Sequence, residues 1–146
     1  MSSHPWLLLV YKVPPEPTAR RVYVWRKLKR LGAILLHDAV WVLPNTALTR
    51  EQLQWLAAEI VEMEGEALVW EAQLTMAGQA ETLRAQFLAQ SESAYGELLG
   101  QLEQADCDLA ALSKRYQQVS STDYFQSPLG QRVRAALLAA RVDMEP

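Results

Sequence analysis

The first half of the chain alternates between continuous apolar runs and segments of mixed character. The run "WLLLVYKV" (6–13) is rich in β-branched and aromatic residues, which is typical of a central strand buried on both faces. The prolines of 14–17 end this strand, because proline has no N–H to donate to a strand ladder. "AILLHDAVWVLP" (33–44) predicts strand structure with a bend or bulge at "HDA", and "EALVWEAQL" (66–74) predicts a further strand.

The segment after the prolines predicts an amphipathic helix over 19–31. Thr18 is the expected N-cap and Gly32 the expected C-terminal stop. One arc of the helical wheel is apolar and holds Val24, Trp25, Leu28 and Leu31. The opposite, broader arc carries Arg20, Arg26, Lys27, Lys29 and Arg30, while Arg21 lies near the apolar side in the first turn. All five tryptophans are expected in the hydrophobic core: Trp6, Trp25, Trp41, Trp55 and Trp70.

A second helix is predicted from a capping box of Thr49 and Gln52 through about Met63, with Gly65 as its stop. The predicted order is therefore strand, helix, two strands, helix, strand. This β-α-β-β-α-β order is that of the ferredoxin-like fold, in which four antiparallel strands carry both helices on one face. We expect the α+β class, with residues 1–76 forming a ferredoxin-like sandwich.

Residues 77–146 predict a helical extension of this sandwich. Apolar residues recur at spacings of three and four over 77–119, which indicates one long helix or a helical hairpin broken near Gly96 or Gly100. We expect the extension to pack on the sheet, so that the chain forms one structural domain. A self-associating coiled-coil seam is the alternative.

The C-terminal residues predict a loop over 120–128 and a short last helix that ends near Arg141. Ser127 is its expected N-cap and Pro128 its first residue. With 50% hydrophobic and 21% charged residues and no run long enough to cross a membrane, a soluble protein is expected. The single cysteine, Cys107, excludes an intramolecular disulfide and fits a reducing, cytoplasmic compartment.

Charge is distributed unevenly along this chain of net charge −3. Residues 1–50 carry eight Lys or Arg against two acids, a balance of +6, and the remainder carries six bases against fifteen acids, a balance of −9. Six of the eight bases lie within 18–32, which contains no acidic residue. Such a cationic helix predicts contact with phosphates or another oxyanion. A solvated face that pairs with acidic helices of the same protein is the alternative.

Candidate catalytic chemistry is sparse. His4, His37 and Cys107 lack the spacing of a zinc site. The sequence also contains neither a glycine-rich phosphate loop nor a nucleophile elbow. We therefore expect no enzymatic activity, no catalytic residue, no metal and no cofactor.

Several segments resemble the N-terminal domain of ChrB proteins, regulators associated with chromate resistance in bacteria. The similarity lies in the opening Trp-Leu-Leu-Leu strand with its prolines, in Ala19-Arg20 followed by Trp25-Arg26, in Gly32-Ala33, and in the strand ending Leu43-Pro44. "GEALVWEAQ" (65–73) and "DYFQSPLG" (123–130) also resemble later segments of that family. The resemblance covers almost the whole chain and implies kinship with the ferredoxin-like domain of PaaX-type repressors.

The resemblance implies a DNA-associated, chromate-responsive transcriptional regulator that acts as a homodimer in the cytoplasm. In this hypothesis the contacts to DNA phosphates come from Arg20, Arg21, Arg26, Lys27, Lys29 and Arg30. The alternative is an oxyanion-binding or protein-interaction module, in which the basic helix binds chromate or docks an acidic partner without binding DNA. A third hypothesis, a redox enzyme acting through Cys107, has no other support in the sequence.

Two departures accompany these resemblances. ChrB proteins often continue into a second, C-terminal domain, and if effector sensing resides there, this chain alone is not expected to sense chromate. The same fold carries the nuclease of CRISPR adaptation, whose metal-binding aspartate follows the first strand. Lys12 stands in that stretch here, and lysine does not ligate Mg²⁺, so a nuclease of that type is not expected.

Overall fold

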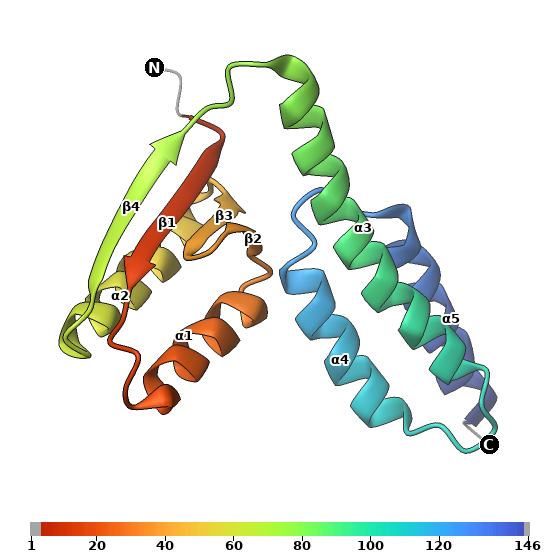
Figure 1. Cartoon of the computed structure of the whole chain (residues 1–146). Coiled ribbons are helices and arrows are strands. Elements are labelled where there is room, and N and C mark those ends of the chain that lie inside the picture. The colour runs from red at the N-terminus through yellow and green to blue at the C-terminus, as the bar shows by residue number, and fades with distance from the viewer. Residues whose placement is uncertain (1–3, 145–146) are drawn as a thin grey trace. The chain divides into compact units, whose positions relative to one another are not determined.

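The computed structural model describes residues 4–144, and the chain divides into two compact units, Met1–Thr75 and Met76–Pro146. The first unit contains all the strands and the second contains only helices (Figure 1). That the second unit packs on the first as one structural domain stays a prediction.

The first unit is a four-stranded antiparallel sheet with two helices. Its elements in chain order are β1 (Trp6–Lys12), α1 (Thr18–Arg30), β2 (Ile34–His37), β3 (Val40–Pro44), α2 (Ala47–Glu62) and β4 (Glu66–Ala72). The strands lie in the order β2-β3-β1-β4, and every neighbouring pair is antiparallel. This is the ferredoxin-like arrangement, so the predicted α+β class is confirmed.

Strand β1 is central, as its continuous apolar run predicted. Leu7 pairs with Leu43 and Leu9 pairs with Trp41, so these four side chains share one face of the sheet, and all four are buried. The two helices add further buried side chains, namely Val24 and Leu28 from α1 and Leu53, Leu56 and Ile60 from α2. This core fixes which faces of α1 and α2 remain open to solvent.

The start of α1 differs from the prediction and its end confirms it. Pro17 is the N-cap, in an extended conformation (φ −74°, ψ 149°), so the predicted capping role of Thr18 is wrong and Thr18 is the first helical residue. At the other end Gly32 takes a left-handed φ of 79°. Its N–H donates to the Lys29 carbonyl, and the next N–H, of Ala33, donates to the Leu28 carbonyl (both 3.1 Å), which is a Schellman stop.

The N-cap of helix α2 lies three residues before the predicted one. Thr46 is the N-cap, and Thr46 and Thr49 form a reciprocal capping box in which each side chain accepts from the other's backbone N–H. The Thr49 hydroxyl is fully buried and donates to the Pro44 carbonyl at 2.6 Å, so it ties the helix to the end of β3. The predicted box of Thr49 and Gln52 is wrong because Thr49 occupies the third helical position and not the cap.

The end of α2 also differs from the prediction, in which Gly65 is the stop of the helix. Glu64, and not Gly65, takes the left-handed conformation, with φ 67°. Gly65 is needed for space, since a Cβ there would lie 2.5 Å from the Lys12 carbonyl oxygen. In the β2–β3 hairpin the expected bend at "HDA" is confirmed, because Asp38 has φ 38° and the register shifts between Leu35 and His37.

Only two of the five tryptophans are in the core. Trp6 and Trp41 are buried, whereas Trp25 is 50%, Trp55 67% and Trp70 54% exposed, so the prediction is wrong for these three. Trp25 lies at the margin of the apolar arc of α1, where the sheet does not reach. Trp70 belongs to β4, an edge strand.

The second unit is a bundle of three helices, α3 (Ala77–Leu102), α4 (Leu109–Ser121) and α5 (Pro128–Met144). The hairpin alternative for 77–119 is confirmed, but the break follows Leu102, and both Gly96 and Gly100 lie inside α3. The core consists of Tyr95, Leu98, Leu112, Val119, Val133 and Leu137. Leu129 donates its N–H to the Ser127 hydroxyl oxygen at 3.2 Å, as the predicted N-cap requires, although α5 extends past Arg141.

A buried tyrosine organises this second core. The Tyr95 hydroxyl donates to Asp123 Oδ2 at 3.0 Å, and the same carboxylate accepts from the Ser127 N–H at 3.0 Å. A Cβ at Gly130 would meet the Tyr95 ring and hydroxyl at 3.0 to 3.2 Å, so a side chain larger than glycine does not fit without movement. The segment "DYFQSPLG" therefore holds α3 and α5 together.

Candidate nucleic-acid interface

The basic helix α1 is fixed to the core through Val24 and Leu28, each fully buried. Its cations consequently project from the remainder of the helix surface. Arg21, Arg26, Lys29 and Arg30 are exposed, and Arg20 and Lys27 are partly buried. Three of the cations, Lys27, Lys29 and Arg30, lie in the last turn, where they also interact favourably with the helix dipole.

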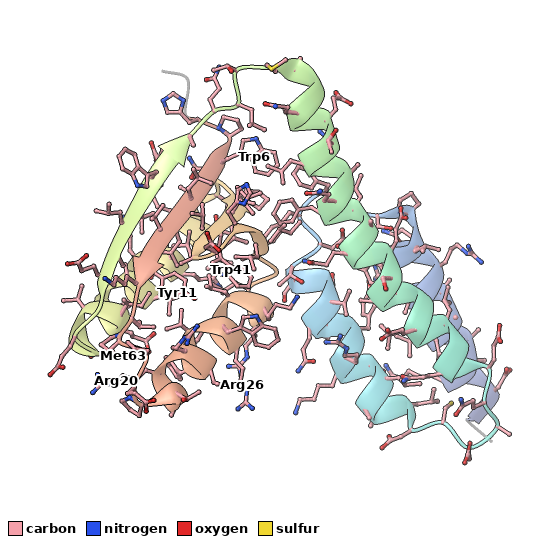
Figure 2. All side chains as sticks on the ribbon, viewed as in Figure 1. Trp6, Tyr11, Arg20, Arg26, Trp41 and Met63 are labelled. Carbon is pink, nitrogen blue, oxygen red and sulfur yellow. The ribbon has the colours of Figure 1, made fainter. Side chains whose placement is uncertain are left out.

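Arg20 differs from the other five because it is engaged within the fold. Its Nη1 donates to the Met63 carbonyl at 2.8 Å and lies 3.9 Å from Glu64 Oε2. Met63 is the C-cap of α2, so the guanidinium satisfies a carbonyl at the end of that helix. Figure 2 shows Arg20 beside Met63 and Arg26 directed elsewhere.

The remaining cations of α1 have no acidic partner among residues 4–144. The ion pairs found there are those of Arg20 with Glu64 and of Arg50 with Glu71. Within the first unit these cations pair with no acidic helix, and the alternative in which they pair with acidic helices of the second unit stays a prediction. Arg26, Lys27, Lys29 and Arg30 form an unpaired cluster over the second half of α1, called here the α1 basic cluster.

Two exposed aromatic rings lie within this cluster. The Lys29 ammonium is 5.7 Å from the centre of the Trp25 ring, and the Lys27 ammonium is 5.8 Å from the centre of the Tyr23 ring. Both distances fall within cation–π range. Trp25 is predicted in the core from its apolar pattern, and Tyr23 is not among the predicted site residues. Each ring precedes its cation by four residues, the spacing of neighbours on one helix face, and this was the signal that could have linked both rings to the basic face.

Tyr23 also connects the cluster to α2. Its hydroxyl donates a short hydrogen bond to Glu59 Oε2. This bond to a carboxylate is the main cause that raises the pKa of Tyr23 above its ordinary value; desolvation and the Glu59 charge raise it further, and the Arg30 charge lowers it. Tyr23, Arg26, Lys27 and Arg30, together with Ala19 and Val22, line an open groove of about 440 Å³ on the surface of α1.

Across 4–144, no three His, Cys, Asp or Glu side chains come together as a metal ion would require. Within the same range, no helix combines the length and the apolar character needed to cross a bilayer.

Comparisons with known proteins agree on one family. The family model "Protein ChrB, N-terminal" matches residues 21–111, which run from the first turn of α1 through β2, β3, α2, β4 and α3 to the start of α4 and do not include β1. The chain is 31% identical over 105 residues to "Protein ChrB" of Cupriavidus metallidurans, and the match covers 72% of this chain. It covers 32% of the relative, so the chain spans about a third of the length of the curated protein that it matches. No solved structure matches the chain significantly.

Proposed function

Because the chain belongs to the ChrB N-terminal family, we propose that it is a DNA-associated regulator of chromate resistance that contacts DNA phosphates through the α1 basic cluster. The protein acts in this proposal as a cytoplasmic homodimer and as a binding protein, not as an enzyme.

The observation that carries the proposal is the set of four cations without an acidic partner in the described residues, Arg26, Lys27, Lys29 and Arg30. Their charges are held on one rigid element whose buried side is anchored by Val24 and Leu28. A cationic surface of this kind releases counterions from DNA on binding. Each neutralised phosphate contributes a slope of about −0.9 to the dependence of log affinity on log salt concentration.

The six cations of α1 take different roles in this proposal. Arg20 is a positioning residue, because its guanidinium already bonds the Met63 carbonyl. Arg21 lies in the first turn, one to three turns from the basic cluster, and contributes less to duplex binding. The exposed Trp25 adds apolar contact to the sugar or base beside the phosphates, since aromatic rings within basic surfaces stack on nucleic acid.

The test is fluorescence anisotropy with duplex DNA from upstream of the protein's own operon, at several salt concentrations, beside a scrambled duplex. We expect sequence-preferring binding that weakens as salt rises. Replacing Arg26, Lys27 and Arg30 with Glu should abolish this binding while the unfolding temperature is unchanged.

A matched control makes the same change in net charge at residues outside α1. Lys114, Arg115 and Arg132 are exposed cations of the second unit, and replacing these three with Glu makes the same change in net charge. This control should retain most of the affinity. An equal loss of duplex affinity in both triple variants would mean that overall charge, and not the α1 basic cluster, causes the effect. This result would contradict the proposed interface.

A wild-type protein that binds no duplex even at low salt would favour the alternative, a module that binds an oxyanion or an acidic protein. Thermal-shift titrations then separate the two, because a ligand that binds the folded state raises the unfolding temperature. Stabilisation by chromate but not by sulfate would indicate a chromate sensor.

A further inference from the structure

The first unit contains a second hollow, at the C-terminal end of β1, that shares no lining residue with the groove on α1. Its walls come from four segments: the end of β1, the β1–α1 loop, the first turn of α1 and the β2–β3 turn. The lining residues are Tyr11, Lys12, Val13, Pro15, Arg21, Asp38 and Ala39. The hollow has a volume of about 440 Å³ and is open to solvent. It is called here the β1-end pocket.

Two cations face this pocket without an acidic partner. Lys12 and Arg21 are both exposed, and neither lies within ion-pair distance of a carboxylate in the part of the chain that the structure describes. Asp38 also lines the pocket but makes no ion pair with either of them. Two cations against one carboxylate leave the lining with one net positive charge.

The Tyr11 side chain supplies a hydroxyl to the pocket lining. Tyr11 is partly buried, and burial raises the pKa of its hydroxyl, while the nearby Trp41 indole and Arg21 guanidinium act in the opposite direction. The hydroxyl is therefore protonated at neutral pH and can donate. Trp41 and Tyr11 are labelled in Figure 2.

The backbone around these groups is held in place. The Tyr11 N–H donates to the Ala39 carbonyl at 3.2 Å, which joins the end of β1 to the hairpin turn. Gly65 packs directly against the Lys12 carbonyl. The residues of the pocket thus come from segments that are joined by backbone contacts and not from a single loop.

We propose that the β1-end pocket binds a tetrahedral oxyanion, with Arg21 and Lys12 neutralising its charge and the Tyr11 hydroxyl donating a hydrogen bond to it. A planar guanidinium bonds two oxygens of such an ion at once, and a lysine ammonium adds a compact charge. The ion is either a free inorganic dianion or a phosphate of the DNA backbone. The proposal does not depend on duplex binding by the α1 basic cluster.

Replacing Asp38 tests whether anion binding changes in the direction that the proposal predicts. Its carboxylate repels an anion in the pocket, so Asp38→Asn should tighten binding, by about threefold. Asparagine tolerates the left-handed conformation that Asp38 adopts, so the turn should be preserved. Weaker binding in Asp38→Asn would contradict the placement of the ion beside this residue.

The main experiment is isothermal titration calorimetry of the full chain with sodium sulfate and with inorganic phosphate, with sodium chloride holding the ionic strength constant. We expect binding to the wild type and about tenfold weaker binding to Lys12→Gln/Arg21→Gln. The matched control is Lys114→Gln/Arg115→Gln, which removes two exposed cations from α4 in the second unit and should bind as the wild type does. No binding of either ion to the wild type, or equal weakening in both double variants, overturns the proposal.

Two further measurements locate the ion and identify its source. In ¹H–¹⁵N spectra, sulfate should shift the amide signals of Tyr11 and Ala39, and shifts confined to the outer face of α1 would overturn the proposal. Anisotropy with duplex DNA then distinguishes the sources. Weaker duplex binding by Lys12→Gln/Arg21→Gln, with phosphate competing against the duplex, identifies a backbone phosphate, and unchanged duplex binding identifies a free ion; both outcomes support the pocket.

Discussion

Helices α1 and α2 pack side by side in the same unit, yet they carry opposite charge and are held by different means. Helix α1 has six cations and no acid, or +6, and α2 has one arginine against three glutamates, or −2. The cation of α2, Arg50, is engaged: its Nη2 lies 2.9 Å from Glu71 Oε1 and donates to Asn45 Oδ1 at 3.1 Å. Of the cations of α1, Arg20 alone has such a partner among the described residues.

This difference separates charges that hold the fold from charges available to a partner. Arg50 and Arg20 each connect one element of the unit to another. The α1 basic cluster makes no ion pair within the first unit, and the repulsion among its charges is a cost to stability that the buried side of the helix must offset. A solvated cluster of this kind is consistent with a surface selected for binding.

The largest expected effect on stability comes from replacing the glycines that follow the two helices. Gly65→Ala, after α2, places a Cβ 2.5 Å from the Lys12 carbonyl and should destabilise the first unit by about 3 kcal/mol. Gly32→Ala, after α1, forces alanine into a left-handed φ of 79° and should cost about 1 kcal/mol. Urea unfolding monitored by circular dichroism gives both values, and a larger cost at Gly32 would contradict this ranking.

At the N-terminal ends of the two helices, a substitution in α2 should again cost more stability than one in α1. Thr49→Val removes the capping box and leaves the Pro44 carbonyl without its buried donor, which should cost about 2 kcal/mol. Thr18→Val removes a threonine that makes no capping bond in the described structure, so the expected change is about 0.5 kcal/mol or less. The same unfolding assay applies to both variants. A comparable loss at Thr18 would mean that α1 is capped after all.

Two arginines of α1 should affect different properties. Arg20 should matter for stability, and Arg26 should matter for duplex binding. Arg20→Gln loses the bond to Met63 and should cost about 1.5 kcal/mol, with little change in duplex affinity. Arg26→Gln should leave stability unchanged within about 0.5 kcal/mol and weaken duplex binding. Thermal unfolding measures the stability of both variants, and anisotropy measures their duplex affinity. If Arg20→Gln proved the weaker DNA binder at full stability, its assignment as a positioning residue would be wrong.

The smallest expected effect concerns the contact between the two helices. The pKa of Tyr23 is raised in the folded state by its bond to Glu59, so the protonated hydroxyl stabilises the fold below the ordinary value of 10.0. This contribution is lost as pH rises through the folded pKa. Wild type should therefore exceed Tyr23→Phe slightly in unfolding temperature near neutral pH, and the difference should vanish at strongly alkaline pH. A gap that widened with pH would reverse the sign of this linkage.

Predictions from the sequence held where local pattern decides the outcome. The order of strands and helices follows from the period of apolar residues, and a continuous apolar run made β1 central. Gly32 ends α1 because the left-handed conformation there favours glycine. The density of Lys and Arg in 18–32 likewise identified the basic helix without any knowledge of its surroundings.

The candidate site required more than local pattern. Arg20 and Arg26 are equivalent on a list of cations, and only the position of Met63 at the end of α2 separates a positioning residue from a free one. The β1-end pocket joins Lys12, Arg21 and Asp38, which belong to three elements and follow no spacing rule in the chain. The break after Leu102, past both candidate glycines, depends on the packing of α3 against α4 and α5.

The sequence by itself determined the ferredoxin-like order, the helical second half, the basic face of α1 and the resemblance to one family, because periodicity, composition and turn residues act over a few neighbouring positions. Only the tertiary structure decided which tryptophans are buried, where α2 is capped, which arginine is engaged and which residues share a pocket. Burial and pairing depend on what another element places opposite a side chain. Trp25 and Trp41 illustrate the limit: both lie in apolar patterns, but the helices and sheet enclose only Trp41.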